Sequence, residues 1–189
     1  MVASVREALD VTGKLLTDGA DAIERSGRLL VDALRARHKI LLFGNGGSAA
    51  QAQHLAAELV ARYLKERPAL AAIALTTDTS TLTAIGNDYG FERLFARQVE
   101  ALAEPGDVAI AISTSGTSAN VLAGVVAARE RGCRVIGLTG AGGAELATRC
   151  DVCVVVPSAT TARTQEAHLL IGHVWCEIID NCLVGARRD

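Results

Sequence analysis

The sequence lacks an excess of charge of either sign. Its 189 residues include 19 Lys and Arg against 21 Asp and Glu, which gives a formal net charge of −2. Nucleic acids and anionic membrane surfaces are normally bound by clustered positive charge, so we expect neither as a partner. Residues 1–16 mix charged and apolar side chains and contain neither the apolar stretch of a signal peptide nor a membrane span. We therefore expect a cytoplasmic protein.

Cysteine is also too sparse for a disulfide scaffold, because the chain has five cysteines, an odd number. Cys150 and Cys153 form a CxxC motif, but no second cysteine pair accompanies it. The motif runs into the apolar sequence CVVVP, which is typical of a buried strand. We favour reduced, mostly buried thiols over a zinc or redox site.

Internal repeats, low-complexity segments and long Pro, Gly or Ser linkers are absent as well. Half of the residues are hydrophobic, enough for the core of one compact domain. We predict a single domain over residues 1–189. Within it, residues 1–37 form a helical segment that packs on the rest of the domain or on a neighbouring subunit.

The apolar pattern predicts an α/β fold. Apolar residues follow helical spacing between residues 5 and 37, with interruptions near Gly13 and Gly19. Five short apolar runs then alternate with helix-like segments, which predicts a doubly wound parallel sheet of about five strands, flavodoxin-like and flanked by helices. A long helix over residues 160–185 closes the chain, with Gly185 near its end.

Ligands of such sheets bind outside the carboxyl ends of the strands. There, a loop of Gly44, Asn45, Gly46, Gly47 and Ser48 lies between the apolar run KILLF and a helix-forming segment. Glycine lets the backbone approach an anion closely, and the helix start and a serine hydroxyl donate hydrogen bonds to it. A phosphate site is one interpretation, and a tight turn with an ordinary Ser N-cap is the other.

A second loop at residues 113–118, sequence STSGTS, follows the run DVAIAI. Five hydroxyls surround one glycine, whereas a helix cap needs only one of them, so we favour phosphate binding over capping. Neither loop has the GxGxxG pattern of a dinucleotide site. We expect no nucleotide cofactor.

Candidate acid–base and metal-binding residues lie on two predicted helices. His54 and Glu58 are four residues apart, so they share a helix face. On the closing helix, Gln165 and His173 are about two turns apart and can face one groove, while His168 need not join them. Two imidazoles, a carboxylate and an amide oxygen suit zinc. The alternatives are a solvated His–Glu pair and a histidine that only packs against its neighbours.

Taken together, the motifs GNGGSAAQAQHLAAEL, AIGNDYGF, ISTSGTSANV, VIGLTG and ARTQEAHLLIGH resemble those of the phosphoheptose isomerases, a family of the sugar-isomerase (SIS) fold. The resemblance extends from about Lys39 to Asp180. It implies conversion of sedoheptulose 7-phosphate to D-glycero-D-manno-heptose 7-phosphate through an enediol, in a homotetramer. Packing between subunits could then bring His173 to Glu58 from another chain.

The resemblance also implies roles for individual residues. It makes Glu58 and His173 the acid–base pair. It implies one zinc ion per subunit, bound by His54, Glu58, Gln165 and His173. Its substrate-binding residues match Asn45, Gly46, Gly47, Ser48, Glu58, Asn87, Asp88, Ser113, Thr114, Ser115, Ser118 and Gln165.

One position departs from the family pattern, and two other functions stay open. Ala162 stands where some members carry an acidic residue, so one auxiliary substrate contact is in doubt. DnaA-initiator-associating proteins share the fold and several sequence stretches, which makes a non-catalytic regulator the main alternative, although those relatives lack the glutamate and second histidine kept here. A SIS enzyme for another sugar phosphate, such as arabinose 5-phosphate or N-acetylmuramate 6-phosphate, is the third possibility.

Overall fold

Five parallel strands form the centre of the protein in a computed structural model, which describes residues 2–184. Their order across the sheet is β2-β1-β3-β4-β5, and every neighbouring pair is parallel. The prediction of a doubly wound, flavodoxin-like sheet is confirmed. The strands are β1 (Ile40–Gly44), β2 (Ala72–Ala74), β3 (Val108–Ser113), β4 (Arg134–Thr139) and β5 (Val152–Val155).

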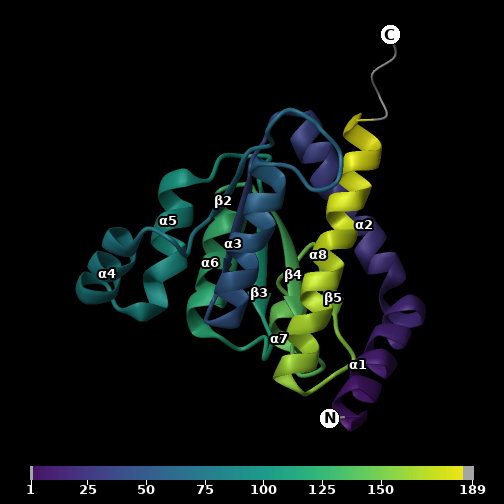
Figure 1. The fold of residues 1–189 in the computed structure, drawn as a ribbon. Helices are drawn as coiled ribbons and strands as arrows, with labels where there is room; N and C mark the ends of the chain where they lie inside the picture. The colour runs from purple at the N-terminus through teal and green to yellow at the C-terminus, as the bar shows by residue number, and fades with distance from the viewer. Residues whose placement is uncertain (1, 185–189) are drawn as a thin grey trace.

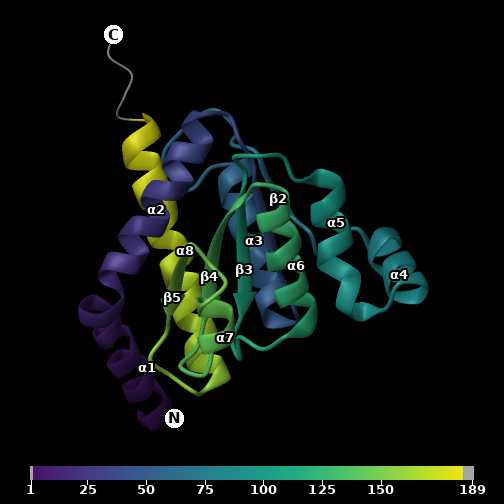
Figure 2. The same cartoon turned by 180° about the vertical axis from the view of Figure 1, so that it is seen from behind.

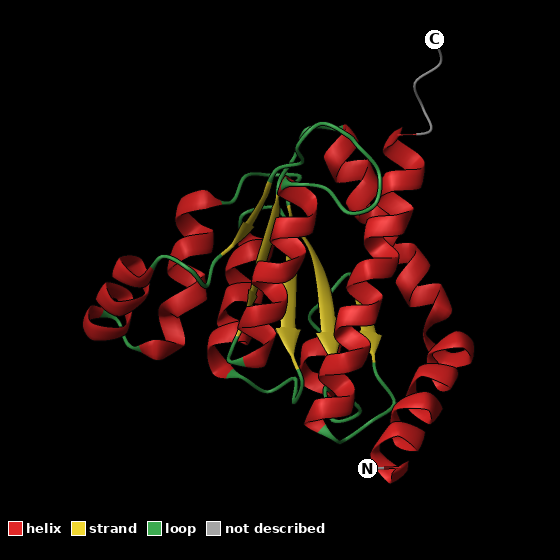
Figure 3. Ribbon diagram, viewed as in Figure 1, coloured by secondary structure: helices red, strands yellow, loops and turns green. Residues whose placement is uncertain are grey.

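Helices cover both faces of this sheet, with α2, α3 and α8 on one face and α5 and α6 on the other (Figures 1 and 2). Figure 3 shows that the arrowheads of the strands point to one edge, where the loops before α3 and α6 lie. The helical elements are α1 (Val2–Lys14), the π-helical η1 (Leu15–Gly19), α2 (Ala20–Arg35), α3 (Gly47–Val60), α4 (Thr79–Asp88), the 3-10 turn η2 (Phe91–Arg93), α5 (Leu94–Leu102), α6 (Ala119–Glu130), α7 (Ala144–Ala147) and α8 (Thr161–Val184).

Alternation along the strands divides the core into two layers. Leu42 of β1 packs on the side of α2, α3 and α8, whereas Leu41 and Phe43 pack on the side of α5 and α6. Successive side chains of a strand point to opposite faces, so a strand covered on both faces reads as a continuous apolar run. Phe43 stacks on Phe95 of α5 with ring centroids 5.3 Å apart.

The N-terminal segment stays helical past its two glycines, although the helix type changes near each of them. Gly13 lies one residue before the end of α1, and a π-helical turn follows that ends at Gly19. Beyond it, α2 lies along α8, where the Trp175 indole N–H donates to the Ile23 carbonyl at 3.2 Å. Within the chain, this segment therefore contacts the closing helix.

Helix α8 is long and apolar enough to cross a membrane by length and composition. In the fold, however, one of its faces packs against the sheet and α2, and its Asp180 is buried in an ion pair with Arg67. These contacts are those of a core helix. The predicted terminal Gly185 lies outside the described residues.

All five cysteines are free thiols, and Cys153 lies within β5 as the sequence predicts. Burial raises the pKa of Cys133 to about 11 and that of Cys176 to about 12. Both thiols therefore stay protonated and unreactive at neutral pH.

Candidate active site

The glycine loop joins β1 to α3 at the carboxyl edge of the sheet. Gly46 has φ +55° and ψ −119°, a backbone conformation that side-chain-bearing residues rarely adopt, and it occupies the N-cap position of α3 without any side-chain cap. Ser48 is already inside the helix, so the interpretation of Ser48 as its N-cap is wrong. The uncapped, partially positive helix start therefore faces the loop.

The serine loop precedes α6 on the neighbouring strand β3. Ser118 is the N-cap residue of α6 but makes no capping hydrogen bond. Its Oγ lies 3.1 Å from the Oγ of Ser113, which also accepts the N–H of Gly116 at 3.1 Å. The loop hydroxyls thus hold the loop together instead of capping the helix, and a second helix start remains open to an anion.

A pair of asparagines joins the two loops. The amide of Asn45 donates to Asn120 at 2.8 Å, and the amide of Asn120 donates back at 2.9 Å. Asn120 is buried in the first turn of α6. Its role was not predicted from the sequence, although a polar residue in an otherwise apolar helical segment was a usable signal.

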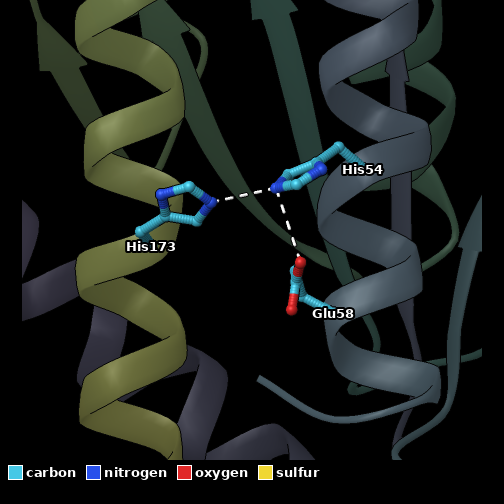
Figure 4. A group of neighbouring side chains, drawn as sticks. All are labelled: His54, Glu58 and His173. Atoms are coloured by element: carbon cyan, nitrogen blue, oxygen red, sulfur yellow. Dashed lines mark hydrogen bonds and ion pairs between the residues drawn. The ribbon is translucent and has the colours of Figure 1, made fainter. Parts of the chain in front are cut away.

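His54, Glu58 and His173 converge within one chain, from α3 and α8 (Figure 4). The Nε2 atoms of the two histidines are 2.9 Å apart, and His54 Nε2 is 3.6 Å from a carboxylate oxygen of Glu58. Their ligand atoms all lie within 4.8 Å of one another. We call these three residues the triad. It needs no residue of a second chain.

Gln165, a predicted metal ligand, packs its side chain against the glycine loop. The side-chain amide of Gln165 packs so closely on Gly47 that a Cβ at Gly47 would collide with it. The backbone carbonyl of Gln165 accepts a hydrogen bond from the Gln51 side-chain amide at 2.5 Å. About two helical turns separate Gln165 from His173 on α8. In the structure Gln165 joins α8 to the loop, and its role as a zinc ligand stays a prediction.

His168 is buried on α8 and is not part of the triad. Neither of its ring nitrogens makes a hydrogen bond. Burial lowers the pKa of His168 to about 4. The nearby Thr139 backbone opposes this shift but makes no hydrogen bond with the ring. His168 is therefore neutral at physiological pH, which fits a packing residue.

Asn87 and Asp88 belong to neither loop. They are exposed at the end of α4, which packs against α5 and η2 at one side of the molecule (Figure 1). The Asn87 amide donates to the Asp88 carboxylate at 2.7 Å. Of the remaining predicted contacts, Thr114 is half-buried and Ser115 is exposed in the serine loop. The substrate-binding roles of these four residues stay predictions, as do those of the other predicted contacts.

The triad fits a divalent metal by the chemistry of its donors. Two imidazoles and one carboxylate form a common zinc ligand set with an open position. The Nε2 atoms of His54 and His173 face each other at hydrogen-bond distance. When both Nε2 atoms are unprotonated, their lone pairs can bind one cation. His54, Glu58 and His173 are therefore the residues that would hold the ion.

Comparison with known proteins connects this geometry to a family. A model of the SIS domain matches residues 5–140. The chain is 56% identical to a phosphoheptose isomerase from Rhodospirillum rubrum over 168 residues, covering 89% of each chain. It belongs to the SIS-domain family, among the phosphoheptose isomerases.

Two further family members extend the similarity over almost the whole chain. A phosphoheptose isomerase from Solidesulfovibrio magneticus is 53% identical over 190 residues, covering 100% of this chain and 93% of the relative. The structure of a phosphoheptose isomerase from Neisseria gonorrhoeae superimposes with a TM-score of 0.90 at 46% identity, covering 95% and 96% of the two chains. This similarity does not favour the regulator or the enzymes for other sugar phosphates.

Proposed function

We propose that the chain is an aldose–ketose isomerase that converts sedoheptulose 7-phosphate to D-glycero-D-manno-heptose 7-phosphate through an enediol. The observation that carries this proposal is the convergence of His54, Glu58 and His173 within 4.8 Å. It is accompanied by two loops that end in uncapped helix starts, one of them the start of α3 itself. This reaction requires an anion site and a proton-transfer site, and α3 starts at the first and carries His54 and Glu58 of the second. Membership of the phosphoheptose isomerases supports the choice of substrate.

The phosphate binds first in this account. Ser48 and the hydroxyls of residues 113–118 donate hydrogen bonds to it, together with the starts of α3 and α6. The asparagine pair fixes the spacing between the two loops. The phosphate is thereby held at the loops while the other end of the sugar extends toward the triad.

Proton transfer then takes place at C1 and C2. The Glu58 carboxylate removes a proton from C1 of the ketose, the C1–C2 enediol forms, and a proton returned to C2 leaves the carbonyl at C1. The His173 imidazole moves the proton between the two substrate oxygens. Glu58 is half-buried, which limits competition from water.

The substrate assignment is tested with a panel of sugar phosphates. Purified protein is incubated separately with sedoheptulose 7-phosphate, arabinose 5-phosphate and N-acetylmuramate 6-phosphate, and the products are identified by NMR. We expect turnover of the heptulose phosphate only. Turnover of only one of the other two sugar phosphates would make that compound the substrate. If none is turned over and the protein binds a DnaA-type initiator measurably, the regulator function would be supported.

We also propose one zinc ion per subunit, held by His54, Glu58 and His173, with Gln165 as the predicted fourth ligand. When bound, the ion would act as a Lewis acid on the substrate oxygens. Metal analysis of protein purified without chelators should find about one zinc per chain, and His54→Ala should reduce it. Full activity after complete removal of zinc would show that the carboxylate and imidazole act without a metal.

A cytoplasmic homotetramer of this single domain completes the proposal. Leu9, Leu16 and Leu170 expose much of their side chains, and a groove of about 360 Å³ between α1, η1, α2 and α8 is almost wholly apolar. Apolar surface of this kind is normally covered by a partner subunit. Light scattering should give a mass of four chains, and Leu16→Glu should shift it to a smaller species.

A further inference from the structure

Tyr63 lies directly on the imidazole of His173. The two rings stack with centroids 5.5 Å apart and an angle of 23° between their planes. His54 meets the same imidazole edge-on, with centroids 5.1 Å apart at 65°. The imidazole of His173 therefore contacts two rings: His54, its partner in the triad, and Tyr63, which stacks on it.

The segment that carries Tyr63 is fixed to α8. One carboxylate oxygen of Asp180 accepts the backbone N–H groups of Leu64 at 3.2 Å and Lys65 at 3.0 Å, the two residues that follow Tyr63. The Lys65 ammonium also donates to the side chain of Asn181 at 2.7 Å. A loop without regular structure thus has a defined position beside His173.

Arg67 extends this connection to α3. Its guanidinium donates to Asp180 at 2.9 Å, and both side chains of this pair are only 2% exposed. The same group donates to the carbonyl of Glu58 at 2.7 Å and to that of Leu59 at 2.8 Å. One buried ion pair therefore binds the helix of His173, the backbone of Glu58 and the Tyr63 loop together.

We propose that Tyr63, held in place by the Arg67–Asp180 ion pair, is a positioning residue that keeps the His173 imidazole directed at His54 and Glu58. The proposal rests on the proposed function of the triad. The aromatic ring is the active part, since stacking depends on the ring face. Consistently, burial raises the pKa of Tyr63, with nearby carboxylates adding to the shift, so its phenol stays neutral.

Two substitutions separate the ring from the hydroxyl. Tyr63→Phe keeps the ring and should leave kcat within about twofold of the unmutated protein. Tyr63→Leu removes the ring and should lower kcat about tenfold or more with little change in KM, because a misplaced catalytic group slows the reaction without weakening phosphate binding. Leu64→Ala, at an exposed side chain of the same loop, is the matched control and should change neither constant.

A measurement independent of activity uses NMR of the histidine rings. The chain has only four histidines, so His173 can be assigned by its loss in His173→Gln. Its ring resonances should shift in Tyr63→Leu, where the aromatic ring current is gone, and stay in place in Tyr63→Phe and Leu64→Ala. Thermal unfolding checks that each variant is folded.

Unchanged His173 resonances and kcat in folded Tyr63→Leu would overturn the proposal, as would an equal loss in Tyr63→Phe. If the unmutated protein turns over no sugar phosphate, the proposed function fails, while the resonances still decide whether Tyr63 stacks on His173.

Discussion

The glycine and serine loops and the triad are built from different parts of the chain. Each loop is a few consecutive residues between a strand and the helix that follows it. The triad joins α3 to α8, and its two histidines are 119 residues apart in sequence. A backbone-based anion site is thus specified locally, whereas a side-chain acid–base site depends on how two distant helices pack.

This difference has a functional consequence. In the proposed reaction the loops contact a phosphate that does not change, so they would contribute equally to the ground state and the transition state. The triad acts on the atoms that exchange protons. Loop variants should therefore change KM, and triad variants should change kcat.

The largest effect is expected for His173→Gln. Loss of a general acid–base typically lowers the rate about 10²- to 10⁴-fold, so kcat should fall by that amount with KM nearly unchanged. Steady-state kinetics on sedoheptulose 7-phosphate measures both constants. Glu177→Gln, an exposed residue one turn further along α8, is the control. A change confined to KM in His173→Gln would remove the distinction between the two regions.

Arg67→Ala tests the packing that brings the triad together. Removing one partner of a buried ion pair leaves an uncompensated charge and costs about 3–5 kcal/mol of the free energy of unfolding. Arg149→Ala breaks an exposed pair with Glu145 and should cost about 0.5 kcal/mol. Urea unfolding measures both. Equal stability of the two variants would mean that the Arg67 pair does not hold α3 to α8.

Acid should destabilise the folded protein through His168. Its pKa is about 4 in the folded protein and about 6.5 in an unfolded chain. Between these values only the unfolded state takes up the proton, so stability falls by about 3 kcal/mol as pH drops from 6.5 to 4. Folded His168→Phe, compared by thermal unfolding over this range, should lose less stability. An identical pH dependence would contradict this assignment.

The smallest effect is expected for Asn120→Ala, which removes the connection between the loops. Two hydrogen bonds are lost, each worth about 1 kcal/mol. We expect about half of this free energy to be lost from phosphate binding, so KM should rise about fivefold with kcat nearly constant. A fall in kcat without a change in KM would show that the loop spacing also controls the triad.

The sequence predicted what depends on local pattern. Five apolar runs gave the five strands, and glycine and serine loops appeared directly after β1 and β3. For both loops the sequence left helix capping open as the alternative to anion binding. The structure contradicts that alternative, since Ser48 lies inside α3 and Ser118 bonds to Ser113 without capping α6. A side chain near a helix start has several acceptors and donors within reach, and sequence alone does not choose between them.

The sequence did not predict contacts that depend on tertiary packing. Tyr63 and the Arg67–Asp180 pair act across elements more than 100 residues apart, and no periodicity marks such pairs. His173 entered through family resemblance, and the structure supplies its neighbours. Gln165 shares a helix with His173, yet packing places its side chain on the glycine loop.

The central claim is that Glu58 is the group that moves protons between C1 and C2. Glu58→Gln keeps the shape of the side chain and removes the base. Aldose formation from sedoheptulose 7-phosphate, followed by NMR with folded protein and saturating substrate, tests this claim most directly. We predict a rate at least about 10²-fold lower than that of the unmutated protein, and turnover at the unmutated rate would contradict the account.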